Sequence, residues 1–570
     1  MPGGRNLCTK EAPGRSKLGR VYAIQNKAEG NAFIAREDKH LNSPTTGKNL
    51  MSSLRGLLYP QSEKPSSQEE GLSAWVPGGQ IDETTLAVKG FLREVVIIRH
   101  QRQNVRGQFK QLELLLKRAA PLISELTVLL NKSTLPLSIS AREIATAVDS
   151  LLKAFALSYY ELAETLDGKW FRVLHARQTP LAALRAAQLI HWRALLAYQV
   201  YSNGSPQRWK QYHALLAMTE KPGKDAGEED KTLSSAMESL AKIIVQSSLL
   251  TLSDPTSLKE EDIGHVRFYI ERYGHLASLS KNLPPSVDSQ TPGIFVLSDN
   301  PRGPQRLKPE YGDLSKCHIL DTRPLIQKLK QQIQWLKEGR SPTNLGLPSV
   351  ANTPAYQLLL MQCEEQWSFT RKRRHPRSGV RPRADLVSGF DMVHHFVAQK
   401  ALTRRRSDDI RPNEALSVSE WSIVDQSEGG FGLRFIKGNA GSISVGEIVA
   451  LCFKDHASLA ICVTRRARCI SDTEFEIGLE LLAERALATN ISIRENKDAE
   501  PLERTPAILI PRMPNAHNVP GLLLPPHRSS KAGIEVSVVS NGKTLRLAAA
   551  ESLEYFSSCE LVAMKPMLHQ

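Results

Sequence analysis

Residues 421–430 read Trp-Ser-Ile-Val-Asp-Gln-Ser-Glu-Gly-Gly, a strand-like run that ends in a glycine-rich turn. Further strand-like runs follow at 432–435, 448–453, 459–470 and 475–482, with turn residues between them. Strands of this length and spacing indicate a small antiparallel barrel. We therefore predict a β-barrel over residues 371–486, with an insertion near 390–411 that includes one or two helical turns.

A basic run precedes these strands and reads Arg371-Lys372-Arg373-Arg374-His375-Pro376-Arg377. Between residues 371 and 411, twelve Lys or Arg stand against four Asp or Glu, a net charge of +8. The whole chain has 570 residues and a formal charge of +15, so over half of the excess lies in this segment. The charge permits an anionic partner, but a solvated basic linker has the same composition.

The chain is too long for one core, and its N-terminal part differs from the barrel. Residues 1–80 are rich in Gly, Pro, Ser, Asn and Lys, which predicts a disordered basic tail. From 81 to 366, apolar residues recur at three- and four-residue steps, which predicts a helical domain. Two segments, 186–220 and 231–279, have the length of helical-hairpin repeats, but they lack repeat signatures, which favours an irregular bundle. A proline-rich tract at 281–312 indicates a break, with a short strand at 293–297.

A second β-rich region lies at residues 500–565. Asn541-Gly542 separates two strand-like runs, and this dipeptide is typical of a two-residue hairpin turn. The region is either an extension of the barrel or a small module of its own. The predicted fold class is therefore multidomain α + β, with an irregular N-terminal helical bundle, a small antiparallel β-barrel and a short C-terminal β module.

Several classes of function are disfavoured by what the sequence lacks. The seven cysteines form no CxxC pair and no zinc-ligand spacing, so we expect a reducing compartment and no metal. No apolar run has the length of a transmembrane helix, so we expect a cytoplasmic protein. The sequence has no HExxH, GxSxG or phosphate-binding GxxxxGK[ST] motif. We therefore predict a protein that is not an enzyme, with no catalytic residue and no cofactor.

Two groups of polar residues suit an anionic ligand that carries guanine bases. Arg373 and Arg377 lie four residues apart, and each guanidinium matches phosphate oxygens or the O6 and N7 edge of guanine. Asp425 can accept hydrogen bonds from guanine N–H groups, and Ser427 supplies a short hydroxyl. Gly430 permits close backbone approach.

This combination resembles the PilZ domain, a bacterial receptor module for the second messenger cyclic di-GMP. The family pattern is RxxxR followed by (D/N)xSxxG, and here it reads Arg373 to Arg377 and Asp425 to Gly430. The resemblance covers about a fifth of the chain. It implies that cyclic di-GMP is the ligand and that the basic run is an arm that folds over it. The implied ligand-binding residues are Arg373, Arg374, Arg377, Asp425, Ser427 and Gly430.

The sequence departs from the family pattern in two ways. The spacing from Arg377 to Asp425 is longer than usual, which the insertion near 390–411 would explain. A second RxxxR runs from Arg377 to Arg381, so the arm has two registers, Arg373/Arg377 and Arg377/Arg381. We favour the first register, because Arg-Arg-His-Pro-Arg resembles the commoner family form.

The predicted function is a noncatalytic cyclic di-GMP receptor that relays the signal to a protein partner through its helical domain. One alternative is a PilZ-like scaffold that binds no nucleotide and works in pilus or motility assembly. Another is a basic nucleic-acid-binding protein, which would need aromatic side chains among the arginines. Phe390 and Phe396 are the only aromatic residues between 371 and 411, so we do not expect nucleic acid as a partner.

Overall fold

The protein was analysed as a computed structural model that describes residues 80–566 apart from short internal gaps. The gaps are 102–103, 131–132, 169–177, 220–230, 285–286, 289–290, 301, 309–313, 370–381, 399–417, 454–458, 472–473, 495–504, 512–518, 526–534 and 541–542. The tail predicted over residues 1–80 therefore lies outside the described residues except for its last position. The same is true of Arg373, Arg374 and Arg377. Among the described helices, none is both long and apolar enough to cross a membrane.

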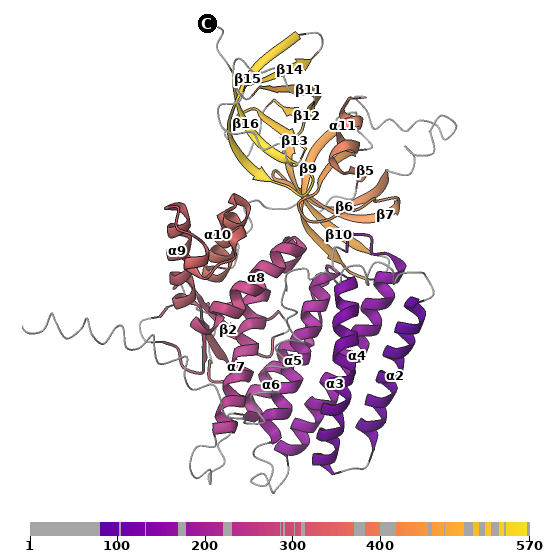
Figure 1. Ribbon diagram of the computed structural model, residues 1–570, viewed down its shortest axis with the longest axis vertical. Coiled ribbons are helices and arrows are strands. Elements are labelled where there is room, and N and C mark those ends of the chain that lie inside the picture. Colours follow the sequence, from indigo (N-terminus) through magenta and orange to yellow (C-terminus); the bar gives the residue numbers. More distant parts are fainter. Residues whose placement is uncertain are drawn as a thin grey trace, which may run out of the picture. The chain divides into compact units, whose positions relative to one another are not determined.

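The N-terminal part is helical, as predicted (Figure 1). Its helices are α2 (Gln80–His100), α3 (Val105–Leu129), α4 (Ile139–Asp167), α5 (Gln178–Gln199), α6 (Gln207–Thr219), α7 (Lys231–Leu252) and α8 (Glu260–Tyr273). Side-chain caps fix two helix starts, since Asn104 Oδ1 accepts from Gly107 N at 2.7 Å and Ser138 Oγ from Ala141 N at 3.1 Å. Helix α5 contacts α4, α6 and α7 and is buried nearly all round, so it forms the centre of this part.

The proline-rich tract contains more structure than its sequence indicated. The strand expected at 293–297 is present as β2 (Ile294–Leu297). It belongs to a four-stranded sheet of order β1-β4-β2-β3 that was not predicted, with β1 (Ser278–Ser280), β3 (Gln305–Arg306) and β4 (His318–Asp321). Helices α9 (Arg323–Lys337) and α10 (Pro354–Ser368) follow this sheet. Strands of two to four residues carry no readable period, so only the fully apolar β2 was visible in the sequence.

The predicted antiparallel barrel is present and closed, with strand order β10-β7-β6-β5-β8-β9. Its strands are β5 (Arg383–Ser388), β6 (Ser419–Ser427), β7 (Gly430–Gly438), β8 (Ile448–Phe453), β9 (Leu459–Cys469) and β10 (Phe475–Ala483). Alternate side chains fill the interior, with the fully buried Trp421 and Leu433 among them. We call this the first barrel.

The C-terminal region is a second closed barrel, of order β11-β12-β13-β16-β15-β14. Its strands are β11 (Leu487–Arg494), β12 (Thr505–Ile510), β13 (Gly521–Leu524), β14 (Glu535–Ser540), β15 (Lys543–Tyr555) and β16 (Glu560–Pro566). The pair Ser540↔Lys543 confirms the predicted two-residue hairpin between β14 and β15. The strands of this region close on one another, and each has the same neighbours as the corresponding strand of the first barrel.

A continuous apolar core joins the two barrels. The first barrel contributes outward side chains of β5, β8 and β9, including Ile461 and Val463. The second barrel contributes outward side chains of β12, β13 and β16, including Leu523. Helix α11 (Phe390–Ala398), the described part of the predicted insertion, buries Phe390 and Val393 in the same core. The insertion therefore begins with a packing helix, which Figure 1 shows beside the barrels.

Candidate functional site

The turn between β6 and β7 is a tight hairpin that requires glycine. Ser427 pairs with Gly430 across a two-residue turn, and the Leu481 amide donates to the Gly429 carbonyl at 3.0 Å. Gly430 has φ +153°, and a Cβ built on it would lie 1.9 Å from the backbone oxygen of Leu479. Any side chain here would therefore push β7 away from β10. The sequence prediction that Gly430 allows close backbone approach is consistent with this geometry.

A β-bulge directs Asp425 onto the outer face of the first barrel. Ile423 pairs with Leu433 but Asp425 pairs with Gly432, so Val424 is an extra residue on β6. Ile423 points into the core, and the bulge turns Asp425 outward. A Cβ at Gly432 would lie 2.4 Å from Asp425 Oδ1, so the carboxylate crosses over the glycine.

Four adjacent strands carry a row of side chains across this face. Gly432 pairs with both Asp425 and Gly478, and Gly478 pairs with Arg466. With strands about 4.8 Å apart, the row spans about 14 Å from the carboxylate to the guanidinium. Between its charged ends lie two glycines. The Asp425 carboxylate covers Gly432, so the backbone is open at Gly478, between the carboxylate and Arg466. We call this row the glycine floor.

Two pairs of oppositely charged residues lie beside the glycine floor. Arg434 binds Glu476 at 2.8 Å, and this contact raises the pKa of Arg434. Arg465 Nε binds Glu480 Oε2 at 2.5 Å, and Glu480 stands opposite Gly430 in the sheet. The two acids are therefore largely neutralised, so they oppose an anionic ligand less than free carboxylates would.

The described part of the predicted site is thus brought together on one face. Asp425, Ser427 and Gly430 lie on β6 and β7, at or next to their hairpin. The predicted arginines lie outside the described residues, but the chain that follows them is placed. The Pro382 carbonyl accepts from the Ile423 amide at 3.0 Å, and Arg383 pairs with Ser422. Because β5 runs antiparallel to β6, the chain enters the barrel from the Asp425 end of β6.

The candidate site also includes Gly432, Gly478 and Arg466, which the sequence prediction did not name. Glycine inside a strand marks a place where another group approaches the backbone, and this signal was available at Gly478. The position of Arg466 was not readable, because it depends on a shift of register between β9 and β10. Among the described residues, no group of three potential metal ligands is present.

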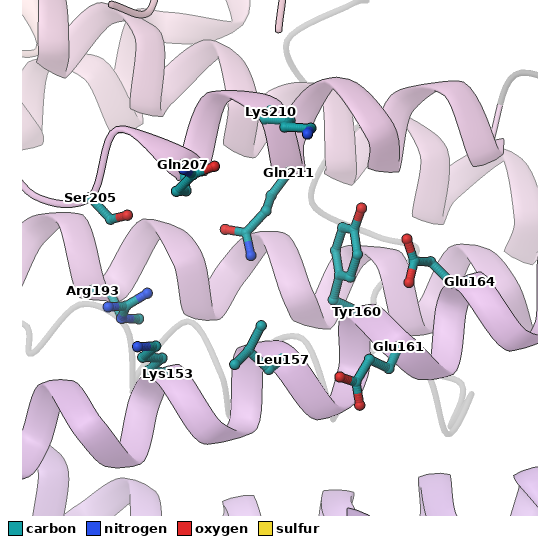
Figure 2. Close-up of a pocket in the computed structure, with 10 residues that line it drawn as sticks. All are labelled: Lys153, Leu157, Tyr160, Glu161, Glu164, Arg193, Ser205, Gln207, Lys210 and Gln211. Carbon is teal, nitrogen blue, oxygen red and sulfur yellow. The ribbon is translucent and has the colours of Figure 1, made fainter. Parts of the chain in front are cut away.

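A separate hollow of about 430 Å³ lies between helices α4, α5 and α6 (Figure 2). Its lining mixes cations such as Lys153 with the acids Glu161 and Glu164, and none of the predicted residues contributes to it. Burial and the neighbouring Glu164 raise the pKa of Tyr160 there to about 12. Tyr160 therefore stays protonated at neutral pH.

The closed six-stranded barrel with its DxSxxG hairpin defines a PilZ-domain protein, and comparisons with known proteins agree. Residues 403–487 match the family model described as "Cyclic-di-GMP receptor FimW, middle PilZ domain". Residues 71–285 match the model for the N-terminal domain of the same receptor. The chain therefore belongs to the FimW family of cyclic di-GMP receptors. A search of curated proteins found no match.

The resemblance to the PilZ domain is thus confirmed. The match to the middle domain includes Asp425, Ser427, Gly430 and Gly478, but it begins after the basic run that contains Arg373 and Arg377. The roles of these arginines and of the individual motif residues remain predictions.

Proposed function

We propose that this protein is a noncatalytic receptor that binds cyclic di-GMP on the glycine floor. The observation that carries the proposal is the row from Asp425 across Gly432 and Gly478, in which the carboxylate lies over Gly432 beside open backbone at Gly478. A purine can lie flat where no side chain projects, and a carboxylate can accept hydrogen bonds from the N1 and N2 hydrogens of guanine. Ser427 lies near this row and offers its hydroxyl to the ligand.

The basic run would close over the ligand from the other side. Arg377 precedes the anchored Pro382 by five residues, a stretch that spans at most about 18 Å. Along β6 the distance from Ile423 to Ser427 is about 13 Å, so the arm is long enough to pass the whole hairpin. Arg373, Arg374 and Arg377 would then contact phosphate and guanine, and their planar guanidiniums suit both groups.

The helical part would pass the signal to a protein partner. Large apolar side chains are exposed on three of its helices, and these would contact the partner. They are Leu86, Val96 and Ile97 on α2, Leu114, Val128 and Leu129 on α3, and Ile139 on α4. We place this activity in the cytoplasm. Affinity purification with and without cyclic di-GMP would identify a partner that depends on the ligand.

Calorimetry with cyclic di-GMP on the full chain tests the site. We expect Asp425→Ala and Arg377→Ala each to weaken binding at least tenfold, because a charge-assisted hydrogen bond is lost in each case. Arg373→Ala and Arg381→Ala decide between the two registers of the arm. Arg118→Ala is the control, since it removes an arginine from α3 that pairs with Glu94, and it should leave the affinity within about twofold.

Two outcomes would contradict the proposal. Tight wild-type binding that survives both Asp425→Ala and Arg377→Ala would place the ligand elsewhere. A wild-type protein that binds no cyclic di-GMP would favour the scaffold alternative, in which the barrel serves assembly only.

A further inference from the structure

Arg466 at the end of the glycine floor is held by the helical part of the chain. Its Nε donates to the Thr256 hydroxyl at 3.0 Å, and its Nη2 lies 3.7 Å from Asp254 Oδ1. The Thr256 hydroxyl in turn donates to Asp254 Oδ1 at 2.9 Å. Thr256 lies in the 3-10 turn η4 (Pro255–Ser257), which joins α7 to α8. A short chain of hydrogen bonds therefore links the floor to this turn.

A β-bulge on β9 allows Arg466 to contact the α7–α8 turn while the neighbouring Arg465 contacts the second barrel. Gly478 pairs with Arg466 but Leu479 pairs with Thr464, so Arg465 is an extra residue. The bulge lets two consecutive arginines leave the barrel surface. Arg465 binds Glu480 and also Glu554 of β15, whereas Arg466 binds the α7–α8 turn. One arginine thus ties the first barrel to the second barrel, and the other ties it to the helical part.

Arg466 has unused capacity to bind an anion. Its side chain is 50% exposed, whereas Thr256 is almost fully buried. A guanidinium carries five N–H donors, and within the described part of the chain only Nε of Arg466 makes a hydrogen bond. A phosphate can be held side-on by Nε and Nη2 of a guanidinium, and these are the two atoms that now face Thr256 and Asp254. Arg466 is therefore both available to a ligand and engaged with the helical part.

The loops that meet β9 are held in uncommon backbone conformations. Among the described non-glycine residues, the two with positive φ are Tyr201 (55°) and Asp254 (48°). The Tyr201 carbonyl accepts from the Cys469 amide at 2.8 Å, and Asp254 faces Arg466. Asp254 also precedes Pro255, and this position restricts its backbone further. Such conformations cost free energy and cluster at sites that switch, so contacts with β9 help to maintain them.

We propose that Arg466 is a further ligand-contacting residue, shared between a phosphate of the bound dinucleotide and the α7–α8 turn. When the guanidinium turns to the phosphate, its contacts with Thr256 and Asp254 break, and the strained backbone of the α7–α8 turn can relax. Ligand binding and the hold on the turn thus compete for one side chain, and this competition couples the site to the helical part. The inference rests on the proposed cyclic di-GMP site.

Because the ligand and the α7–α8 turn compete for Arg466, two substitutions should change the affinity for cyclic di-GMP in opposite directions. Arg466→Ala should weaken cyclic di-GMP binding to the full chain at least tenfold, because a phosphate contact is lost. Thr256→Val keeps the size of the side chain but removes the hydroxyl, so it should free Arg466 and strengthen binding about threefold or more. Arg468→Ala removes an arginine from the same strand without touching the turn, and it should change the affinity less than twofold. Calorimetry measures all three, and thermal unfolding checks that each variant is folded.

Hydrogen exchange supplies a second readout. Cyclic di-GMP should speed amide exchange in residues 253–258 of the wild type, and Arg466→Ala should show this faster exchange without ligand. If Arg466 has only a structural role, both Arg466→Ala and Thr256→Val should bind cyclic di-GMP within twofold of wild type. That result would overturn this inference but not the proposed function. Failure of the wild type to bind cyclic di-GMP overturns the proposed function as well, so the two failures are distinguishable.

Discussion

The six strands are connected in the same order in both barrels, yet three corresponding strands of each barrel have outer faces with different roles. Strands β6, β7 and β10 of the first barrel correspond to β12, β13 and β16 of the second. In the first barrel the outer face of these strands carries Asp425 and the glycine floor. In the second barrel the same face carries Ile508, Leu523 and Leu561, which are buried against the first barrel.

The difference shows that the connection order alone does not create a binding site. The two faces differ in the residues whose side chains point outward. These are glycines and one acid on the first barrel, and branched apolar residues on the second. The hairpins differ as well. The β6–β7 turn has two residues, whereas ten residues separate Ile510 from Gly521 in the second barrel. We therefore expect cyclic di-GMP to bind the first barrel only.

The largest expected effect comes from a charge placed on corresponding strands of the two barrels. Leu523→Asp on β13 would bury an unpaired carboxylate in the core between the barrels and lower the free energy of unfolding by about 4 kcal/mol or more. Ile436→Asp on β7 is the matched control, because Ile436 is 39% exposed and should cost less than about 0.5 kcal/mol. Urea denaturation measures both. Equal losses would mean that the two faces are not used differently.

A smaller loss is expected from Gly430→Ala at the β6–β7 hairpin. The new Cβ would meet the Leu479 carbonyl, so we expect the unfolding free energy to fall by about 3 kcal/mol and ligand binding to be lost. Gly264→Ala on α8 is the same chemical change in open space, and it should be neutral or stabilise by up to about 1 kcal/mol. A Gly430→Ala protein as stable as wild type would disprove the close approach of β7 to β10.

The smallest effect is expected at the ionic contact between the barrels. Arg465→Ala removes the partner of both Glu480 and Glu554, and all three side chains are about one-third exposed. Solvent screening at that exposure limits the loss to about 1 kcal/mol. Arg434→Ala removes an ion pair within one barrel and should cost less than about 0.5 kcal/mol. Urea denaturation compares the two variants, and a larger loss for Arg434→Ala would contradict a role of Arg465 between the barrels.

Much of the fold was predictable from the sequence, because long periodic elements carry a clear signal. The helices α2 to α8 follow the three- and four-residue apolar spacing, and the strands β6 to β10 were each expected within a few residues of their bounds. The closure of the C-terminal region into a second barrel was not predicted. Its strands β12 and β13 are short and mostly apolar, so the sequence around Ile508 and Leu523 gives no sign that one face is covered by another barrel.

The candidate site was predictable only in part. Asp425, Ser427 and Gly430 form a local motif within one hairpin, so their spacing in the sequence already places them together. Gly478 and Arg466 join them through pairing between strands, and that pairing includes bulges that shift the register by one residue. No local pattern encodes such a shift, so Arg466 became visible only in the folded chain.

The core shared by the two barrels also sets an order of events during protein synthesis. The outward side chains Ile461 and Val463 of β9 are complete in the chain before any of the second barrel exists. Roughly 80 residues lie between Leu487 and Pro566, and at about 5–20 residues per second they take about 4–16 s to make. Helix α11 is already available to cover part of this apolar surface. The rest faces the crowded cell until β12, β13 and β16 emerge, so the nascent first barrel has a brief period in which it is prone to aggregation and suited to chaperone binding.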